Sequence, residues 1–497
     1  MVRLLQTCLP LMAASCVLHG AESRAAGWPQ FRGPDASGIA LDAKPPVRFG
    51  ADTNLLWKIA VPSGRSSPIV WGNFVFLTAQ ASNQLVTLAF EAKTGRELWR
   101  RAAPTDTIEE HHPFSSAAAS TPCTDGERVY TYFGSFGLIA YDFGGREIWR
   151  RALERLPSQY GTATSPILAG GQLILQHDGD STNASLIAFA PATGKTLWES
   201  QRPLAGSCYS TPMVWRHDGV EELIVQGKGR VAAYNLAGGP AKWWVKGWGF
   251  SAVTTPVAGD GMLFAGGSGM GDPSQPTDPV MLWSNLIKYD ANQDGQLAIE
   301  EVPDDLIWHI RKELPIEAPG NSFKIRDLMR WFVDSNHDNL VTKAEWDAMD
   351  AFSKDKFNAD RFVAIRPGGK DDSTETHVAW ETVRGLSEMP SPLCYNGRIH
   401  FIRDGGLWSV LDAKTGKRLV DRERLGIGGQ AVASPIAANG YIYVVNETGT
   451  FAVLRSGDLL EIVSVNRLDE SVRSNPAVAG NTLYVRTAEH LWAFAQK

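Results

Sequence analysis

The feature that most constrains this chain is a short repeat in which a Ser, Thr or Asn precedes a proline eight times. The prolines lie 41 to 54 residues apart, except for one gap of 136 residues. They are Pro68, Pro122, Pro166, Pro212, Pro256, Pro392, Pro435 and Pro476. A regular period of this size is the signature of a repeat architecture, so it overrides a domain count based on length alone.

Each repeat carries the pattern of four short strands. After the proline come an apolar strand, a turn such as 169–171 (Ala-Gly-Gly) and a second strand. A third strand ends in a glycine turn such as 92–95 (Ala-Lys-Thr-Gly), and the fourth strand usually carries a tryptophan. Four antiparallel strands every 40-odd residues describe a propeller blade, so the sequence predicts an all-β eight-bladed propeller.

The two ends of the chain are predicted to close the ring. The last repeat supplies only three strands, whereas residues 54–61 form a fourth-strand pattern with its own Trp57. We therefore expect this strand to complete the eighth blade, which leaves few exposed sheet edges.

The Ser-Pro start of each repeat and the A-x-T-G-x-x-L-W ending at 92–99 resemble the repeat of the pyrroloquinoline-quinone-like (PQQ-like) propellers. That superfamily includes quinoprotein alcohol dehydrogenases and the outer-membrane assembly lipoprotein BamB. The resemblance implies that fourth-strand tryptophans dock each blade on its neighbour. The residues concerned are Trp57, Trp99, Trp149, Trp198 and Trp380.

The long gap contains a segment of different composition, 268–359, with 17 acidic against 9 basic residues. Two stretches in it match the EF-hand loop, in which oxygen ligands stand at positions 1, 3, 5, 7 and 12. The first set is Asp290, Asn292, Asp294, the carbonyl of Gln296, and Glu301. The second set is Asp334, Asn336, Asp338, the carbonyl of Leu340, and Glu345. The sequence thus predicts two Ca²⁺ sites; acidic solvated loops are the alternative.

Apolar residues at helical spacing lead into both loops, as expected for complete EF-hands. They are Val280, Trp283, Leu286 and Ile287, then Ile325, Leu328, Met329 and Phe332. The segment interrupts the fifth blade between its second and third strands. That connection opens on the same face as the crossings between blades, so we expect the pair to cap this face.

Residues just before each Ser-Pro step should surround the mouth of the channel on that face. Several are polar or aromatic and form a candidate ligand face: Arg65, Glu110, His112, Tyr160, Tyr209, Glu388, Gln430 and Arg473. The run 109–112 (Glu-Glu-His-His) is the densest candidate for metal or acid–base chemistry. Surface loops are usually polar, however, so a solvated loop is the alternative interpretation.

The N-terminus indicates export. Residues 1–26 combine a basic start, an apolar stretch and small residues, as in a signal peptide. Cys16 stands in a poor lipid-attachment motif, and no stretch is long enough to span a membrane. The expected domains are therefore the leader, a propeller over 27–267 and 360–497, and the inserted pair at 268–359. We expect a periplasmic or secreted protein.

Two function classes fit these features. One is a non-enzymatic calcium-binding scaffold whose propeller face binds a protein or small molecule. The other is a quinoprotein dehydrogenase that holds PQQ at the channel mouth. Such dehydrogenases carry an adjacent cysteine pair, whereas Cys123, Cys208 and Cys394 are far apart here, so the first class is favoured. The net charge of −6 and the lack of a basic run argue against a nucleic-acid partner.

Overall fold

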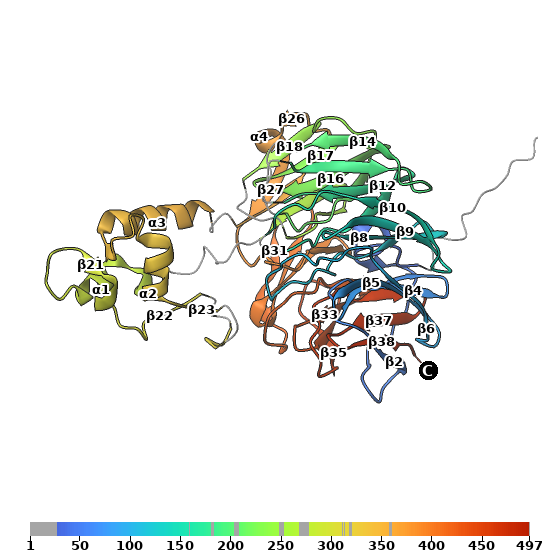
Figure 1. Cartoon of the computed structure of the whole chain (residues 1–497). Coiled ribbons are helices and arrows are strands. Elements are labelled where there is room, and N and C mark those ends of the chain that lie inside the picture. The colour runs from blue at the N-terminus through green and yellow to red at the C-terminus, as the bar shows by residue number, and fades with distance from the viewer. Residues whose placement is uncertain are drawn as a thin grey trace, which may run out of the picture.

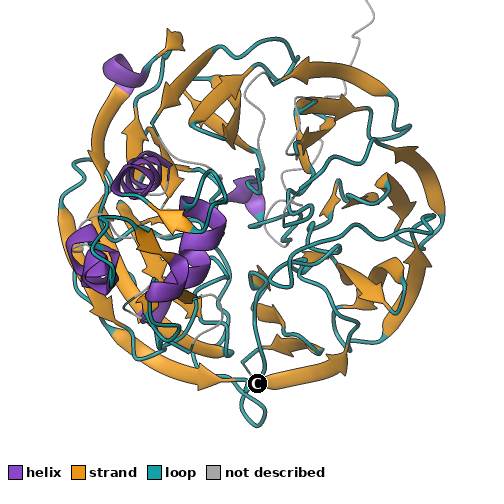
Figure 2. Ribbon diagram, turned by 60° about the vertical axis from the view of Figure 1, so that its left-hand side comes forward, coloured by secondary structure: helices purple, strands orange, loops and turns teal. Residues whose placement is uncertain are grey.

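The computed structural model describes residues 27–158, 160–179, 183–202, 208–247, 253–267, 278–310, 312, 314–317, 321–356 and 360–496. Eight sheets of at least four strands surround a common centre, as the view along the ring axis shows (Figure 2). The predicted eight-bladed propeller is confirmed. The leader predicted at 1–26 lies outside the described residues.

Each blade is an antiparallel meander whose first strand lies innermost. Blade 1 comprises β3 (Ile69–Trp71), β4 (Phe74–Ala81), β5 (Gln84–Glu91) and β6 (Glu97–Ala102). Blade 2 comprises β7 (Cys123–Thr124), β8 (Arg128–Phe133), β9 (Gly137–Asp142) and β10 (Glu147–Ala152). Blade 3 comprises β11 (Ile167–Ala169), β12 (Gln172–His177), β13 (Ser185–Phe189) and β14 (Thr196–Gln201).

Blades 4 and 5 depart slightly from this plan. Blade 4 comprises β15 (Met213–His217), β16 (Val220–Gly227), β17 (Arg230–Tyr234) and β18 (Trp243–Lys246), extended by β26 (Asp371–Asp372). Blade 5 comprises β19 (Val257–Gly259), β20 (Met262–Gly267), β25 (Arg361–Ile365) and β27 (Val378–Thr382), with the short helix α4 (Thr374–His377) before its last strand. The parallel pairing of β18 with β26 links the outer edges of the two blades.

The last three blades complete the ring. Blade 6 comprises β28 (Leu393–Tyr395), β29 (Arg398–Arg403), β30 (Leu407–Asp412) and β31 (Arg418–Arg424). Blade 7 comprises β32 (Ile436–Ala438), β33 (Tyr441–Val445), β34 (Thr450–Arg455) and β35 (Ile462–Arg467). Blade 8 joins β36 (Ala477–Ala479), β37 (Thr482–Arg486) and β38 (His490–Phe494) to β2 (Leu55–Ala60), so the predicted closure by 54–61 is confirmed.

Fourth-strand tryptophans hold neighbouring blades together, as the resemblance implies. The indole N–H of Trp57 donates to the Ala92 carbonyl at 3.0 Å, and its ring packs on Gly95. A side chain at Gly95 would collide with that ring and would also need a φ of +75°. The other four indoles donate in the same way to the carbonyls of Phe143, Pro191, Leu236 and Ala413.

A segment that the repeat pattern did not predict crosses the centre of the ring. We call residues 27–50 the N-terminal strap; it includes η1 (Pro34–Ala36) and β1 (Ile39–Ala40). It reaches the first strands of blades 1 to 4 at Val70, Thr124, Leu168 and Arg216. Farther along, Arg32 donates to the Pro392 carbonyl before blade 6, and β1 pairs with β32 of blade 7.

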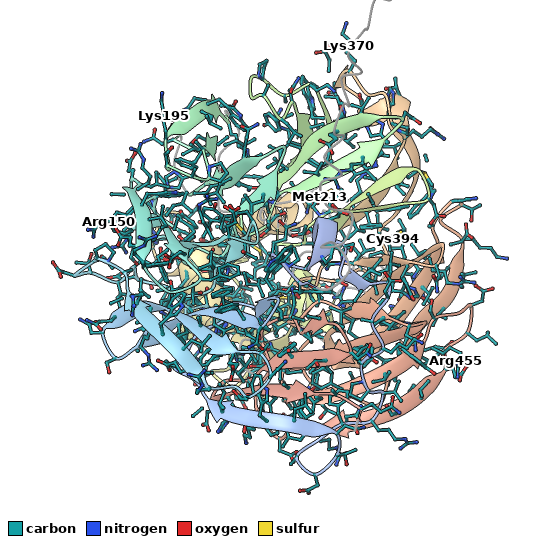
Figure 3. The ribbon with its side chains drawn as sticks, turned by 90° about the vertical axis from the view of Figure 1, so that its right-hand side faces the viewer. Arg150, Lys195, Met213, Lys370, Cys394 and Arg455 are labelled. Carbon is teal, nitrogen blue, oxygen red and sulfur yellow. The ribbon has the colours of Figure 1, made fainter. Side chains whose placement is uncertain are left out.

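The strap lies toward the turns that join first and second strands. Figure 3 views this face, with Met213 of β15 near the centre and Arg150, Lys195, Lys370 and Arg455 at the rim. The Arg32 side chain is almost fully buried and donates to three main-chain carbonyls, those of Ala36, Ser37 and Pro392. Burial lowers the pKa of Arg32 to about 9. The strap therefore links blades that are far apart in the sequence.

The insertion leaves blade 5 after β20 and returns at β25. It contains η2 (Pro279–Met281), α1 (Trp283–Leu286), η3 (Ile287–Tyr289), β21 (Leu297–Ala298), η4 (Ile299–Glu301), β22 (Ile307–His309), β23 (Ser322–Lys324), α2 (Ile325–Leu328), the π-helical turn η5 (Met329–Val333), β24 (Leu340–Val341) and α3 (Lys343–Lys356). These elements lie beside one face of the propeller, opposite the strap (Figures 1 and 2). Within the described ranges, no helix is long and apolar enough to cross a bilayer.

A buried acidic group in blade 4 should make stability depend on pH. Glu222 accepts from Lys242, His217 and Trp243, and although burial alone would raise its pKa, these hydrogen bonds lower it below the usual value of 4.5. Its stabilising effect is thus complete above pH 4.5 and is lost as the pH falls through the lower folded pKa.

We expect Glu222→Gln to lower the free energy of unfolding by about 2 kcal/mol at pH 7 and to reduce the loss of stability at acid pH. Urea unfolding at several pH values measures the stability and its dependence on pH. The control is Glu221→Gln at the neighbouring, more exposed side chain, which should leave the loss of stability at acid pH unchanged.

Candidate ligand face and metal-binding loops

The crossings between blades and the insertion open on the same side of the propeller. In each meander the crossing from a fourth strand to the next first strand lies on the side of the loop between second and third strands. The insertion is the second-to-third connection of blade 5, between β20 and β25. We call this side the insertion face. The predicted ligand residues all lie on these crossings, so the topology places them on one side.

Two arginines from different crossings meet over one aromatic ring. The Arg473 guanidinium lies 4.5 Å from the Phe114 ring centroid, and that of Arg65 lies 5.3 Å away. Arg473 also forms an ion pair with Glu447, from the loop between β33 and β34. Arg65 donates to the Pro113 carbonyl at 3.1 Å. We call Arg65, Phe114, Arg473 and Glu447 the arginine cluster.

An aromatic run continues from this cluster along the face. The main-chain N–H of Phe114 donates to His112 Nδ1 at 3.1 Å. The His112 ring lies 5.0 Å from that of Tyr160, and Tyr160 lies 5.7 Å from Tyr209. Thus five of the eight predicted face residues form one continuous arc with Phe114.

The other predicted face residues contribute less. Gln430 is buried, and its main-chain carbonyl accepts the N–H of Glu447, which supports the loop that carries that carboxylate. Glu110 is exposed, and Glu388 is partly buried on the crossing between blades 5 and 6.

The run 109–112 does not converge on one point. Glu109 turns inward and is buried, where its carboxylate accepts from the N–H and hydroxyl of Thr162 at 3.2 and 3.0 Å. Burial raises the pKa of Glu109 despite these bonds. The His111 ring instead contacts the His112 carbonyl, and Glu110 faces solvent. The predicted metal or acid–base centre at this run is therefore not assembled by these side chains.

Electrostatics favour a negative ligand at the arginine cluster. The pKa of Arg65 is lowered to about 10, first by burial and then by the nearby charge of Arg473, while Glu447 acts in the opposite direction. The cluster thus contains two guanidinium groups and one carboxylate, which is paired with Arg473. The arginine cluster is therefore suited to binding an anion.

The first insertion loop, residues 290–301, folds around its own acidic side chains. Asp290 accepts the N–H groups of Gln293 and Gly295 at 2.8 and 2.9 Å. The side chains of Asn292 and Asp294 each accept the main-chain N–H of the residue two positions later. Glu301 accepts from Ala291 and Ala298, so its carboxylate closes the loop.

The second loop, residues 334–345, repeats this pattern. Asp334 accepts the N–H groups of Asp338 and Asn339 at 3.2 and 2.9 Å, and Asn339 has a φ of +65° where the first loop has Gly295. Asn336 and Asp338 again accept from residues two positions later. Glu345 accepts from Ser335 and Thr342 at 3.1 and 3.0 Å.

The two loops are joined as a pair. Leu297 of β21 pairs with Val341 of β24, and each residue occupies the eighth position of its loop. Both side chains are fully buried in a core that lies within the insertion and includes Leu286, Met329 and Trp346. The insertion thus has a hydrophobic core separate from those of the blades.

One predicted core position in the insertion is wrong. Phe332 was expected on the buried side of the helix before the second loop, but its side chain is 64 % exposed, and Val333 is buried instead. The cause is the π-helical turn at Met329–Val333, which widens the last turn and shifts the following side chains around the axis.

The described residues contain no group of three or more His, Cys, Asp or Glu that would by itself hold a metal ion. In each loop the predicted ligands combine three carboxylates with one amide and one main-chain carbonyl, and several of these oxygens accept loop N–H groups. Oxygen-only donor sets of this kind suit a hard cation such as Ca²⁺.

Comparisons with known proteins agree with the fold. Residues 82–246 match the family model described as outer membrane protein assembly factor BamB. BamB from Moraxella catarrhalis has a TM-score of 0.54 at 14 % identity, covering 89 % of this chain and 97 % of that one. The chain folds as an eight-bladed β-propeller, and part of it resembles the BamB family. The computationally designed Ika8 protein shares the fold (TM-score 0.50, 9 % identity, 89 % and 100 % coverage), and no curated protein matches the sequence.

The residues of this propeller do not fit a quinone site of the dehydrogenase type. Its three described cysteines are buried and lie in blade 2, in blade 6 and on the crossing before blade 4, so they cannot form an adjacent pair. The arginine cluster has a surplus of about one positive charge, whereas PQQ carries three carboxylates. A europium-containing methanol dehydrogenase is also similar, with a TM-score of 0.42 at 9 % identity over 95 % of this chain and 98 % of that one.

Proposed function

We propose that this protein is an exported, calcium-binding propeller that acts as a non-enzymatic binding or scaffold module. Its insertion would hold two Ca²⁺ ions, and its insertion face would bind a protein or small-molecule partner. The observation that carries the proposal is the pair of loops with matching hydrogen bonds, joined at Leu297 and Val341. This is the arrangement that two EF-hand loops need in order to fold together.

The proposed ligands are those that the EF-hand pattern of the sequence indicates. Asp290, Asn292, Asp294 and the Gln296 carbonyl would bind one ion, and Glu301 would complete its shell. Asp334, Asn336, Asp338, the Leu340 carbonyl and Glu345 would bind the other. The hydroxyl of Thr342 already contacts Glu345 at 2.9 Å and would orient that carboxylate.

The export part of the proposal rests on the leader pattern of residues 1–26 and on the similarity to an outer membrane protein assembly factor. The proposal does not include a lipid anchor at Cys16. Outside the cytoplasm, calcium sites commonly have dissociation constants of about 10⁻⁴ to 10⁻³ M. Where the calcium concentration lies above this range, the loops would stay filled and calcium would act structurally.

Limited proteolysis tests whether calcium orders the insertion beside the propeller. The insertion carries a charge of −8, so removal of Ca²⁺ leaves its acidic loops to repel each other. We expect a chelator to expose cleavage sites within 268–359 while the two propeller fragments stay intact. Equal protection of the insertion with calcium and with chelator would contradict the proposal.

A further inference from the structure

We propose that the arginine cluster on the insertion face binds a single carboxylate carried by an aromatic or apolar body. The inference deepens the binding role proposed above and rests on it, but it does not require calcium. Arg65 and Arg473 would hold the carboxylate, and Phe114, His112 and Tyr160 would contact the body.

The donors needed for a carboxylate are present. A guanidinium offers five N–H donors in a planar fork that matches a carboxylate. Arg473 directs two of its nitrogens to Glu447. Arg65 donates to the Pro113 carbonyl, and in the described part of the chain it forms no ion pair with any carboxylate. Arg65 is therefore the group that a ligand carboxylate would engage.

The charged groups of the cluster indicate which ligand charge fits it best. Two guanidinium groups and one carboxylate leave a surplus of about one positive charge at the cluster. A monoanion would neutralise it, whereas a phosphate dianion or a tricarboxylate would bring excess negative charge next to Glu447. The partial burial of this pair makes such an imbalance more costly than at an open surface.

The aromatic run offers a surface for the apolar or aromatic part of the ligand. Phe114 is only partly buried, and the Tyr160 side chain is 36 % exposed beside the His112 ring. An apolar or aromatic group attached to the carboxylate would cover this surface and remove apolar area from water. Because the strap crosses the opposite side of the ring, the insertion face is the side from which this ligand would bind.

Calorimetric titration of the full-length mature protein with three matched probes tests the inference. N-acetylphenylalanine carries both the ring and the carboxylate, its amide lacks the charge, and inorganic phosphate lacks the body. We expect one N-acetylphenylalanine per chain and no heat from the amide. Arg65→Gln should weaken binding about tenfold or more, and Phe114→Leu should weaken it less, since it keeps an apolar contact.

Arg48→Gln is the matched control, because it makes the same change at an exposed arginine of the strap. It should bind as the wild type does. Binding of the amide with equal affinity, tighter binding of phosphate, unchanged binding by Arg65→Gln, or no binding of N-acetylphenylalanine would each overturn the inference. A calcium titration on the same samples separates this outcome from failure of the proposed calcium sites.

Discussion

Glu345→Gln is expected to abolish one of two calcium-binding events at calcium concentrations that fill both loops in the wild type. The glutamate at the twelfth position supplies two oxygens and a full charge, and glutamine supplies one neutral oxygen. We expect the affinity of that loop to fall by at least about 100-fold. Because β21 and β24 pair the loops, binding at the first loop should weaken too, though less.

The control for this prediction is Asp305→Asn, which removes one exposed carboxylate from the same insertion outside both loops. It changes the net charge by the same amount, so it separates loss of a ligand from a general loss of attraction for cations. Calorimetry on both variants gives stoichiometry and affinity. Two unchanged calcium sites in Glu345→Gln would show that this loop does not bind through its twelfth residue.

Trp57→Ala is expected to destabilise the propeller by about 3 to 5 kcal/mol, as usual for truncation of a buried tryptophan. The side chain is 8 % exposed, packs on Gly95 and donates to the Ala92 carbonyl. Its strand also completes blade 8, so the lost contacts lie where the two ends of the chain close the ring. Denaturant unfolding monitored by circular dichroism measures the change.

Leu56→Ala on the same strand is the matched comparison. This neighbour is 44 % exposed, so its truncation should change stability by only about 0.5 kcal/mol. If both variants lost the same stability, the strand itself rather than the docking of Trp57 would be responsible for closure.

The sequence predicted those features of the fold that repeat. Strand pattern, closure by 54–61 and tryptophan docking recur in blade after blade, so each copy supports the interpretation of the others. The strap was not predicted because each of its contacts occurs once. Arg32, for example, binds main-chain carbonyls, and a carbonyl leaves no trace in the sequence.

The candidate site was predicted in part for a related reason. The rule that face residues precede each Ser-Pro step identified Arg65 and Arg473 but not their shared ring. Phe114 lies on the same crossing as His112 but was not selected, and Glu447 lies in a loop within blade 7, to which the rule does not apply. Likewise, helical spacing placed Phe332 in the core because a π-helical turn cannot be read from the period of apolar residues.

The most direct test of the central claim is calorimetric titration of the chelator-stripped mature chain, first with Ca²⁺ and then with PQQ, followed by an assay of dye-linked alcohol oxidation. Our account predicts two Ca²⁺ per chain, no PQQ binding and no turnover. Absence of calcium binding would contradict the assignment of the two loops. Stoichiometric PQQ with turnover would instead make the insertion face an active site.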